Sequence, residues 1–126
     1  MEAFRTAVEA GDMDAAAATL HPDVVFRSPV VYKPYEGRDV VTVILRAVGE
    51  TFEDFHYVRE IGAPGDRDTA LVFQARVGER EVEGADFFVT DDDGLITELT
   101  VMVRPMSGMH ALAEAMGRKL EQAGSS

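Results

Sequence analysis

Residues 80–105, REVEGADFFVTDDDGLITELTVMVRP, decide the fold of this chain. Apolar and polar residues alternate on both sides of DDDG at 91–94, which is the pattern of two strands joined by a tight hairpin. The same alternation runs through 52–63 and 68–78, and the connections APGDRD and GE are short. The sequence therefore predicts four strands in one antiparallel meander.

Helical spacing dominates before and after this meander. The segments 2–12 and 13–20 predict two short helices, and 23–29 predicts a strand. Residues 38–52 predict a longer helix with an apolar stripe of Val40, Val43, Ile44, Ala47 and Val48. Residues 107–120 predict a last helix that is capped by Ser107. The order α, α, β, α, β, β, β, β, α predicts the α+β class.

Length and composition narrow the classes of function. The 126 residues predict a single domain over 1–121 with a flexible tail at 122–126. Cysteine is absent, which excludes thiol chemistry, and a formal net charge of −11 opposes binding to nucleic acid or anionic membranes. The N-terminal stretch lacks the pattern of a signal peptide, and no apolar run would span a bilayer. We expect a soluble, cytoplasmic protein.

Three stretches follow one another along the chain: AGDMDAAAATLHPDVVFRSP at 10–29, YEGRDVVTVIL at 35–45 and DDDGLITEL at 91–99. In this order they resemble the NTF2-like superfamily, which includes SnoaL-like polyketide cyclases, ketosteroid isomerases and limonene epoxide hydrolases. The resemblance covers about residues 1–105. It implies a cone in which a strongly bent antiparallel sheet wraps around a helix and encloses an apolar ligand site. It also implies a homodimer through the outer face of the sheet.

Asp86 is the most unusual residue of the meander, because it stands beside Phe87 and Phe88 in a buried strand. Alternation turns Asp86 to the same face as Val82, Gly84 and Phe88. The resemblance places Asp86 at the position where steroid isomerases carry a carboxylic acid that stays protonated. Two interpretations remain open. Asp86 either donates a hydrogen bond to a ligand carbonyl, or its carboxylate orders the core.

The remaining isomerase positions do not match. The resemblance places Ser28 and Pro29 where those enzymes have their general base, and Phe4 where they have a tyrosine. A serine hydroxyl does not abstract a carbon-bound proton unaided, so steroid isomerisation is not expected. Hydrolysis or cyclisation by an acid remains open.

The other candidate ligand-binding residues follow from strand parity and from the resemblance. They are Phe26, Ser28, Tyr32, Tyr57, Phe73, Ala75, Phe88, Leu99, Val101 and Val103. Tyr32 and Tyr35 lie in a proline-flanked loop, where they either form a lid or stay exposed. The opposite face would carry Ala85, Phe87, Val89, Thr100 and Met102, unless the last helix covers it.

Metal and cofactor sites are not predicted. His21, His56 and His110 are isolated from one another, and His21 is expected in an exposed turn. The run Asp91, Asp92 and Asp93 fits a solvated hairpin better than a calcium loop. Two functions remain: a module that binds a small hydrophobic ligand in an apolar cavity, and a SnoaL-like acid/base enzyme that acts on a carbonyl compound through Asp86.

Overall fold

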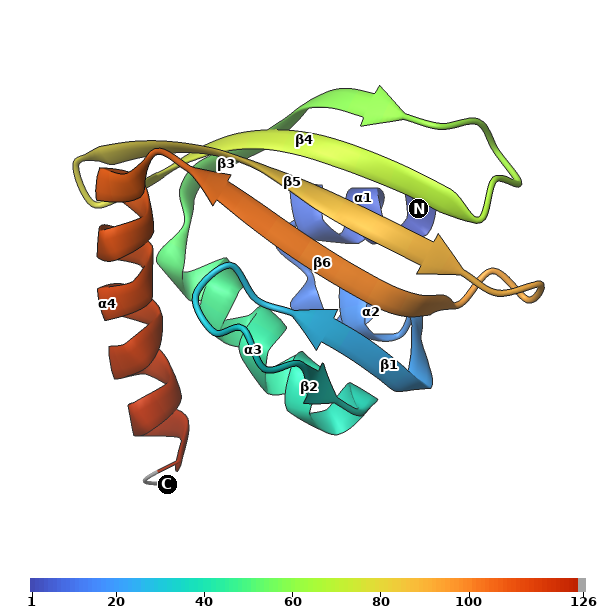
Figure 1. Ribbon diagram of the computed structural model, residues 1–126, viewed down its shortest axis with the longest axis horizontal. Coiled ribbons are helices and arrows are strands. Elements are labelled where there is room, and N and C mark those ends of the chain that lie inside the picture. The colour runs from blue at the N-terminus through green and yellow to red at the C-terminus, as the bar shows by residue number, and fades with distance from the viewer. Residues whose placement is uncertain (125–126) are drawn as a thin grey trace.

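Four helices and a six-stranded sheet make up the part of the chain that the computed structural model describes, residues 1–124 (Figure 1). The helices are α1 (Glu2–Glu9), α2 (Met13–Ala17), α3 (Arg38–Thr51) and α4 (Met106–Gly124). The strands are β1 (Leu20–Arg27), β2 (Tyr35–Glu36), β3 (Glu53–Ile61), β4 (Asp68–Val77), β5 (Arg80–Thr90) and β6 (Ile96–Arg104). This is the predicted α+β order, with the short strand β2 added in the loop before α3.

The sheet has the strand order β2-β1-β6-β5-β4-β3. The pairs from β3 to β6 are antiparallel, so the predicted meander is confirmed. However, β1 runs parallel to β6, with Phe26 opposite Leu99, and the sheet is therefore mixed rather than antiparallel throughout. The sequence predicts a strand at 23–29, but its pattern carries no information on the direction of the partner strand.

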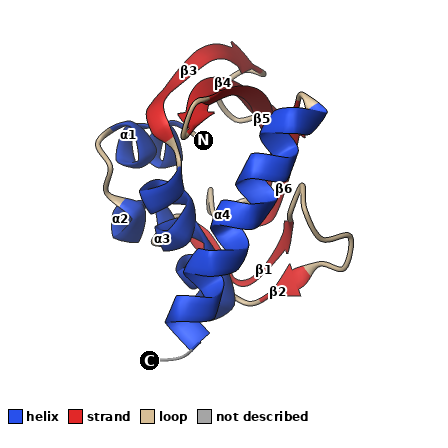
Figure 2. Ribbon diagram, turned by 90° about the vertical axis from the view of Figure 1, so that its left-hand side faces the viewer, coloured by secondary structure: helices blue, strands red, loops and turns tan. Residues whose placement is uncertain are grey.

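The sheet bends around α1, α2 and α3, which lie on its concave side (Figure 1). Helix α4 crosses the open side of the concave space between α3 and the strands (Figure 2). Because α4 lies on this side, the alternative in which the last helix covers the outer face of the sheet is wrong. The outer face stays uncovered in the described chain, and Phe87 and Met102 are exposed there.

The buried face of α3 differs from the predicted stripe. Ile44 and Ala47 are buried as expected, but Val40 and Val43 are exposed, whereas Val41 and Leu45 are buried. Five apolar residues lie within six positions at 40–45, so more than one stripe satisfies helical spacing. Packing against β1 and α4 selects the face.

Three element boundaries also differ from the predictions. Leu20 is fully buried and starts β1, so half-buried His21 lies in a strand, where its Nδ1 accepts the Asp23 backbone N–H at 2.9 Å. Helix α4 begins at Met106, so Ser107 lies inside it and is not its cap. The helix continues to Gly124, beyond the start of the predicted tail at 122, and residues 125 and 126 lie outside the described chain.

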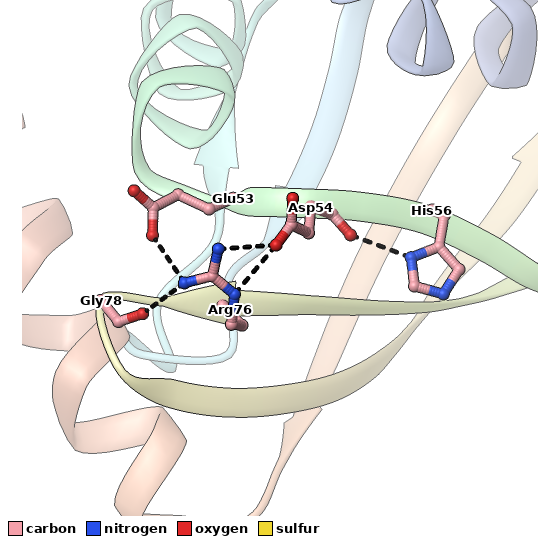
Figure 3. A network of polar contacts seen from close by, with 5 residues as sticks. All are labelled: Glu53, Asp54, His56, Arg76 and Gly78. Atoms are coloured by element: carbon pink, nitrogen blue, oxygen red, sulfur yellow. Dashed lines mark hydrogen bonds and ion pairs between the residues drawn. The ribbon is translucent and has the colours of Figure 1, made fainter.

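A bulge at the start of β3 sets the direction of its side chains. Pairing with β4 shifts between Glu53 and His56, and Asp54 has a left-handed φ of 52°. Arg76 holds this bend with a 2.6 Å ion pair to Asp54 Oδ2 and a 2.9 Å hydrogen bond to the Gly78 carbonyl (Figure 3). After the bend, Tyr57 points to the concave side and is buried.

The core lies on the concave side. Most of its largest fully buried side chains come from four strands, and these include Leu20, Leu71, Phe73, Phe88, Ile96 and Leu99. No helix in the described part of the chain is long and apolar enough to cross a membrane.

Candidate functional site

A cavity of about 570 Å³ lies on the concave side of the sheet. Its walls come from all six strands, from the loop after β1, and from all four helices. The lining strand residues are Phe26, Tyr35, Phe55, Tyr57, Phe73, Asp86, Leu99 and Val101. The lining helix residues include Phe4, Val8, Ile44, Leu45, Val48, Leu112, Met116 and Leu120. The walls are therefore mainly apolar.

Asp86 is the one buried carboxyl group among the described residues that line this cavity. It lies in the middle of β5, between Leu71 of β4 and Val101 of β6, and is 7% exposed. The Tyr57 hydroxyl donates a hydrogen bond of 3.0 Å to Asp86 Oδ2. Within residues 1–124, Tyr57 is the one hydrogen-bond partner of this carboxyl group, which leaves Oδ1 available to a bound molecule.

Burial controls the protonation of this pair. The pKa of Asp86 is raised to about 7, because desolvation raises it by more than the hydrogen bond from Tyr57 lowers it. Burial also raises the pKa of Tyr57, and the neighbouring Asp86 raises it further, so the phenol stays protonated and donates. Near neutral pH, Asp86 therefore exchanges between a neutral acid and a carboxylate.

Arg5 fixes Tyr57 from the side of α1. The Arg5 guanidinium carbon lies 5.8 Å from the centre of the Tyr57 ring. Arg5 Nη1 also forms a 3.3 Å ion pair with Glu60 of β3, and its Nε forms a 3.1 Å ion pair with Glu9 of α1. These contacts tie α1 to β3 around the ring that holds Asp86.

An aromatic cluster continues the wall away from Asp86. The Phe55 ring is stacked on Phe73 with 4.8 Å between the ring centres, and it meets Tyr57 edge-on at 5.0 Å. Phe52 packs edge-on against Phe73 at 5.5 Å. Flat apolar rings match such a surface, since aromatic groups prefer stacked or edge-on contacts.

The structure brings together seven of the residues that the sequence indicated. Asp86, Phe26, Ser28, Tyr57, Phe73, Leu99 and Val101 all line the cavity. The other four lie elsewhere. Tyr32 is fully exposed beside the outer face, Ala75 is buried in the sheet, and Val103 borders a shallow groove next to α4. Phe88 packs edge-on against Phe4, 5.1 Å away, behind the cavity wall.

The structure also places Ser28 and Phe4, the residues that the resemblance puts at the positions of the isomerase base and tyrosine. The Ser28 hydroxyl accepts the backbone N–H groups of Val30 and Val31 at 3.0 and 3.4 Å, so it orders the loop after β1. Phe4 lines the cavity but has no polar atom. Neither residue supplies a base.

Sequence reasoning missed two features of the site. Phe55 and the α4 residues Met116 and Leu120 were not expected to line the cavity, although the apolar spacing of α4 marked one face as buried. The pairing of Tyr57 with Asp86 joins residues 29 positions apart, and neither pattern nor spacing indicates it. Within residues 1–124, no group of three or more His, Asp or Glu side chains is arranged to hold a metal ion.

Comparisons with known proteins agree with this architecture. A family model described as a SnoaL-like domain matches residues 1–99. The structure of a steroid delta-isomerase from Pseudomonas aeruginosa is 47% identical in sequence to this chain. The match covers 96% of this chain and 88% of that chain, with a TM-score of 0.90. A protein from Silicibacter pomeroyi DSS-3, described as uncharacterized with a cystatin-like fold, is 36% identical over 95% of this chain and 84% of its own, with a TM-score of 0.90.

A more distant structure shows the fold alone. The epoxide hydrolase/cyclase-like enzyme SalBIII, described in pyran ring formation in the polyether salinomycin, is 19% identical over 85% of this chain and 88% of its own, with a TM-score of 0.67. The comparison with curated proteins found no match. The family model and the two closer structures establish that this chain belongs to the SnoaL-like domain family of the NTF2-like superfamily.

Proposed function

We propose that the protein binds a small apolar carbonyl compound in the cavity, with Asp86 as the hydrogen-bond donor to the carbonyl oxygen. The observation that carries this proposal is the buried carboxyl group of Asp86 on a mainly apolar wall, where Tyr57 holds it. A volume of about 570 Å³ is in the range of small-molecule sites.

The donor role depends on how the two carboxyl oxygens are used. Oδ2 accepts the hydrogen bond from Tyr57, so Oδ1 carries the acidic proton when Asp86 is neutral. A ligand carbonyl has lone pairs and no proton, and therefore it matches the neutral acid but repels the carboxylate. Ligands with a carbonyl group should bind to the protonated form of Asp86.

A fluorescence titration with the apolar ketone prodan tests this proposal. Because one proton is linked to binding, the Kd of the parent protein should rise by up to about tenfold per pH unit above pH 7. Asp86→Asn keeps an N–H donor without a titrating group, so its Kd should be the same at pH 5 and at pH 8. Asp86→Leu removes the donor and should bind weakly at both values. A parent Kd that does not change with pH would disprove the role of Asp86.

A second candidate function is acid/base catalysis on a carbonyl compound. The name of the 47% identical structure, steroid delta-isomerase, supports it. So does the pKa of Asp86, because a group that titrates near 7 is suited to proton transfer at neutral pH. Against isomerisation stand Ser28 and Phe4, which leave the site without a second acid or base at the positions that the resemblance indicates.

An unsaturated ketosteroid distinguishes the two functions, since isomerisation creates a conjugated ketone that absorbs ultraviolet light. We expect binding without conversion. Conversion by the parent protein that Asp86→Asn abolishes would instead establish the enzyme.

We also propose a homodimer through the outer face of the sheet. Phe87 and Met102 lie on adjacent strands there and are 43% and 60% exposed. Ion pairs border this patch, between Arg104 and Glu83 at 3.3 Å and between Arg27 and Glu98 at 2.7 Å. An apolar centre with a charged rim is the usual composition of a protein interface.

A further inference from the structure

The cavity reaches the surface at two places. Glu9, Gly11 and Gly49 line it and are exposed where the α1–α2 turn meets α3. Val30, Val31 and Gly117 line it and are exposed where the loop after β1 faces α4. The two openings differ in what fills them.

Met13 fills the first opening. A Cβ atom added at Gly49 would lie only 2.8 Å from Met13 Cγ and 2.9 Å from Met13 Cε. An ion pair of 2.8 Å between Arg46 and Asp14 also ties α2 to α3 beside it. A ligand that entered here would have to displace the Met13 side chain and separate two connected helices.

Gly117 leaves the second opening free. A Cβ atom added at this position would meet no atom within 4 Å, although Gly117 is in the interior of α4 and lines the cavity. Glycine destabilises a helix interior relative to alanine, and no close contact at this position requires it. The absence of a side chain at Gly117 therefore keeps the second opening of the cavity free.

Helix α4 holds this space at a fixed place. The Thr51 hydroxyl, which donates to the Ala47 carbonyl at 2.7 Å, lies 3.6 Å from Met116 Sδ, and Lys119 forms an ion pair of 3.6 Å with Glu50. Both contacts attach α4 to α3, one at Met116 just before Gly117 and one at Lys119 just after it. The opposite rim is apolar, because Val30 and Val31 expose their side chains there.

We infer that ligands enter the cavity between α4 and the loop after β1, and that the absent side chain at Gly117 sets the width of this entrance. The inference rests on the proposed function. Gly117 is then a residue that limits the size of the apolar ligand. The carbonyl end of the ligand reaches Asp86, and its apolar part passes Val30 and Val31.

Stopped-flow association of prodan tests the entrance. Gly117→Phe places a large side chain in the opening and should lower the association rate constant at least about tenfold. Gly117→Ala removes the same glycine but adds one methyl group into open space, so its rate constant should stay within about twofold of the parent. Ser107→Phe adds the same ring on an exposed part of α4 away from the cavity and should leave the rate constant unchanged.

Thermal unfolding shows whether the variants fold, and both Gly117 variants should melt at or above the temperature of the parent because each removes a helix-interior glycine. If Gly117→Phe is unfolded, Gly117→Leu takes its place with the same expected loss of rate.

The entrance and the proposed function fail in different ways. If Gly117→Phe associates as fast as Gly117→Ala while the parent Kd depends on pH, the entrance is disproved and the function of Asp86 stands. If Gly117→Phe is slow but the parent Kd does not depend on pH, the entrance is supported and the role of Asp86 is disproved. A parent protein that does not bind prodan disproves both.

Discussion

The Tyr57 hydroxyl and the Asp86 carboxyl group lie 3.0 Å apart and join β3 to β5 across the intervening strand β4. Tyr57 is held from outside by Arg5, and Asp86 is held from both sides by the meander. This polar contact in the mainly apolar cavity wall is therefore built on strands, which position side chains more rigidly than loops do.

The first prediction concerns stability and the charge of Asp86. Its pKa rises from 3.8 to about 7 on folding, so the folded state holds this proton more tightly than the unfolded state. The contribution of Asp86 to the free energy of unfolding should therefore fall as pH rises from about 4 to about 7, and stay constant above. Asp86→Asn should be more stable than the parent at pH 8, by up to the order of 4 kcal/mol.

Urea denaturation of both proteins at pH 5 and pH 8 checks this expectation. The advantage of Asp86→Asn should be larger at pH 8, since the other carboxyl groups are common to both proteins. If Asp86 is instead an ionised anchor of the core, the variant should be less stable than the parent at pH 8 by about 1 to 3 kcal/mol.

The second prediction concerns Tyr57→Phe. The Tyr57 hydrogen bond lowers the pKa of Asp86, so its removal should raise that pKa above 7 and cost about 1 kcal/mol of stability. Carbon-13 NMR titration of the Asp86 carboxyl group measures the change. Tyr35→Phe is the matched control, because Tyr35 lines the cavity but is not the partner of Asp86. An Asp86 midpoint that is equal in parent and Tyr57→Phe would refute the coupling.

The third prediction concerns the outer face. Met102→Glu places a charge at the centre of the apolar patch and should shift the mass measured by light scattering from two chains to one. Met106→Glu is the control, since Met106 is also exposed but starts α4, away from this face. A parent protein with the mass of one chain at micromolar concentration contradicts the dimer.

The meander was predictable because its strands have a period of two in their apolar residues and its hairpins are short. The same alternation placed Asp86 inside, with Val82 and Phe88, and Phe87 outside. The parallel pairing of β1 with β6 was not predictable, since it joins segments more than 70 positions apart through contacts that leave no local pattern. The buried face of α3 was ambiguous because five apolar residues crowd 40–45.

Within the site, parity identified the strand residues but not the depth at which each one lies. Ala75 and Phe88 share the inner face with Phe73 and Asp86, yet they are covered by other side chains. The position of Tyr32 depends on the path of its loop, which no periodicity in the sequence determines. Its side chain lies in solvent. To predict the part of the cavity wall that α4 supplies, one must know that this helix crosses the open side. Its amphipathic pattern does not specify that position.

The bend of β3 at Asp54 has a consequence for the behaviour of the protein at high concentration. As β3 is an edge of an unclosed sheet, its outer backbone groups would otherwise offer a template on which another chain could add a strand. Two register shifts and the exposed charges of Glu53, Asp54, Arg59 and Glu60 interrupt that template. The irregularity that turns Tyr57 toward Asp86 thus also protects the protein against aggregation through this edge.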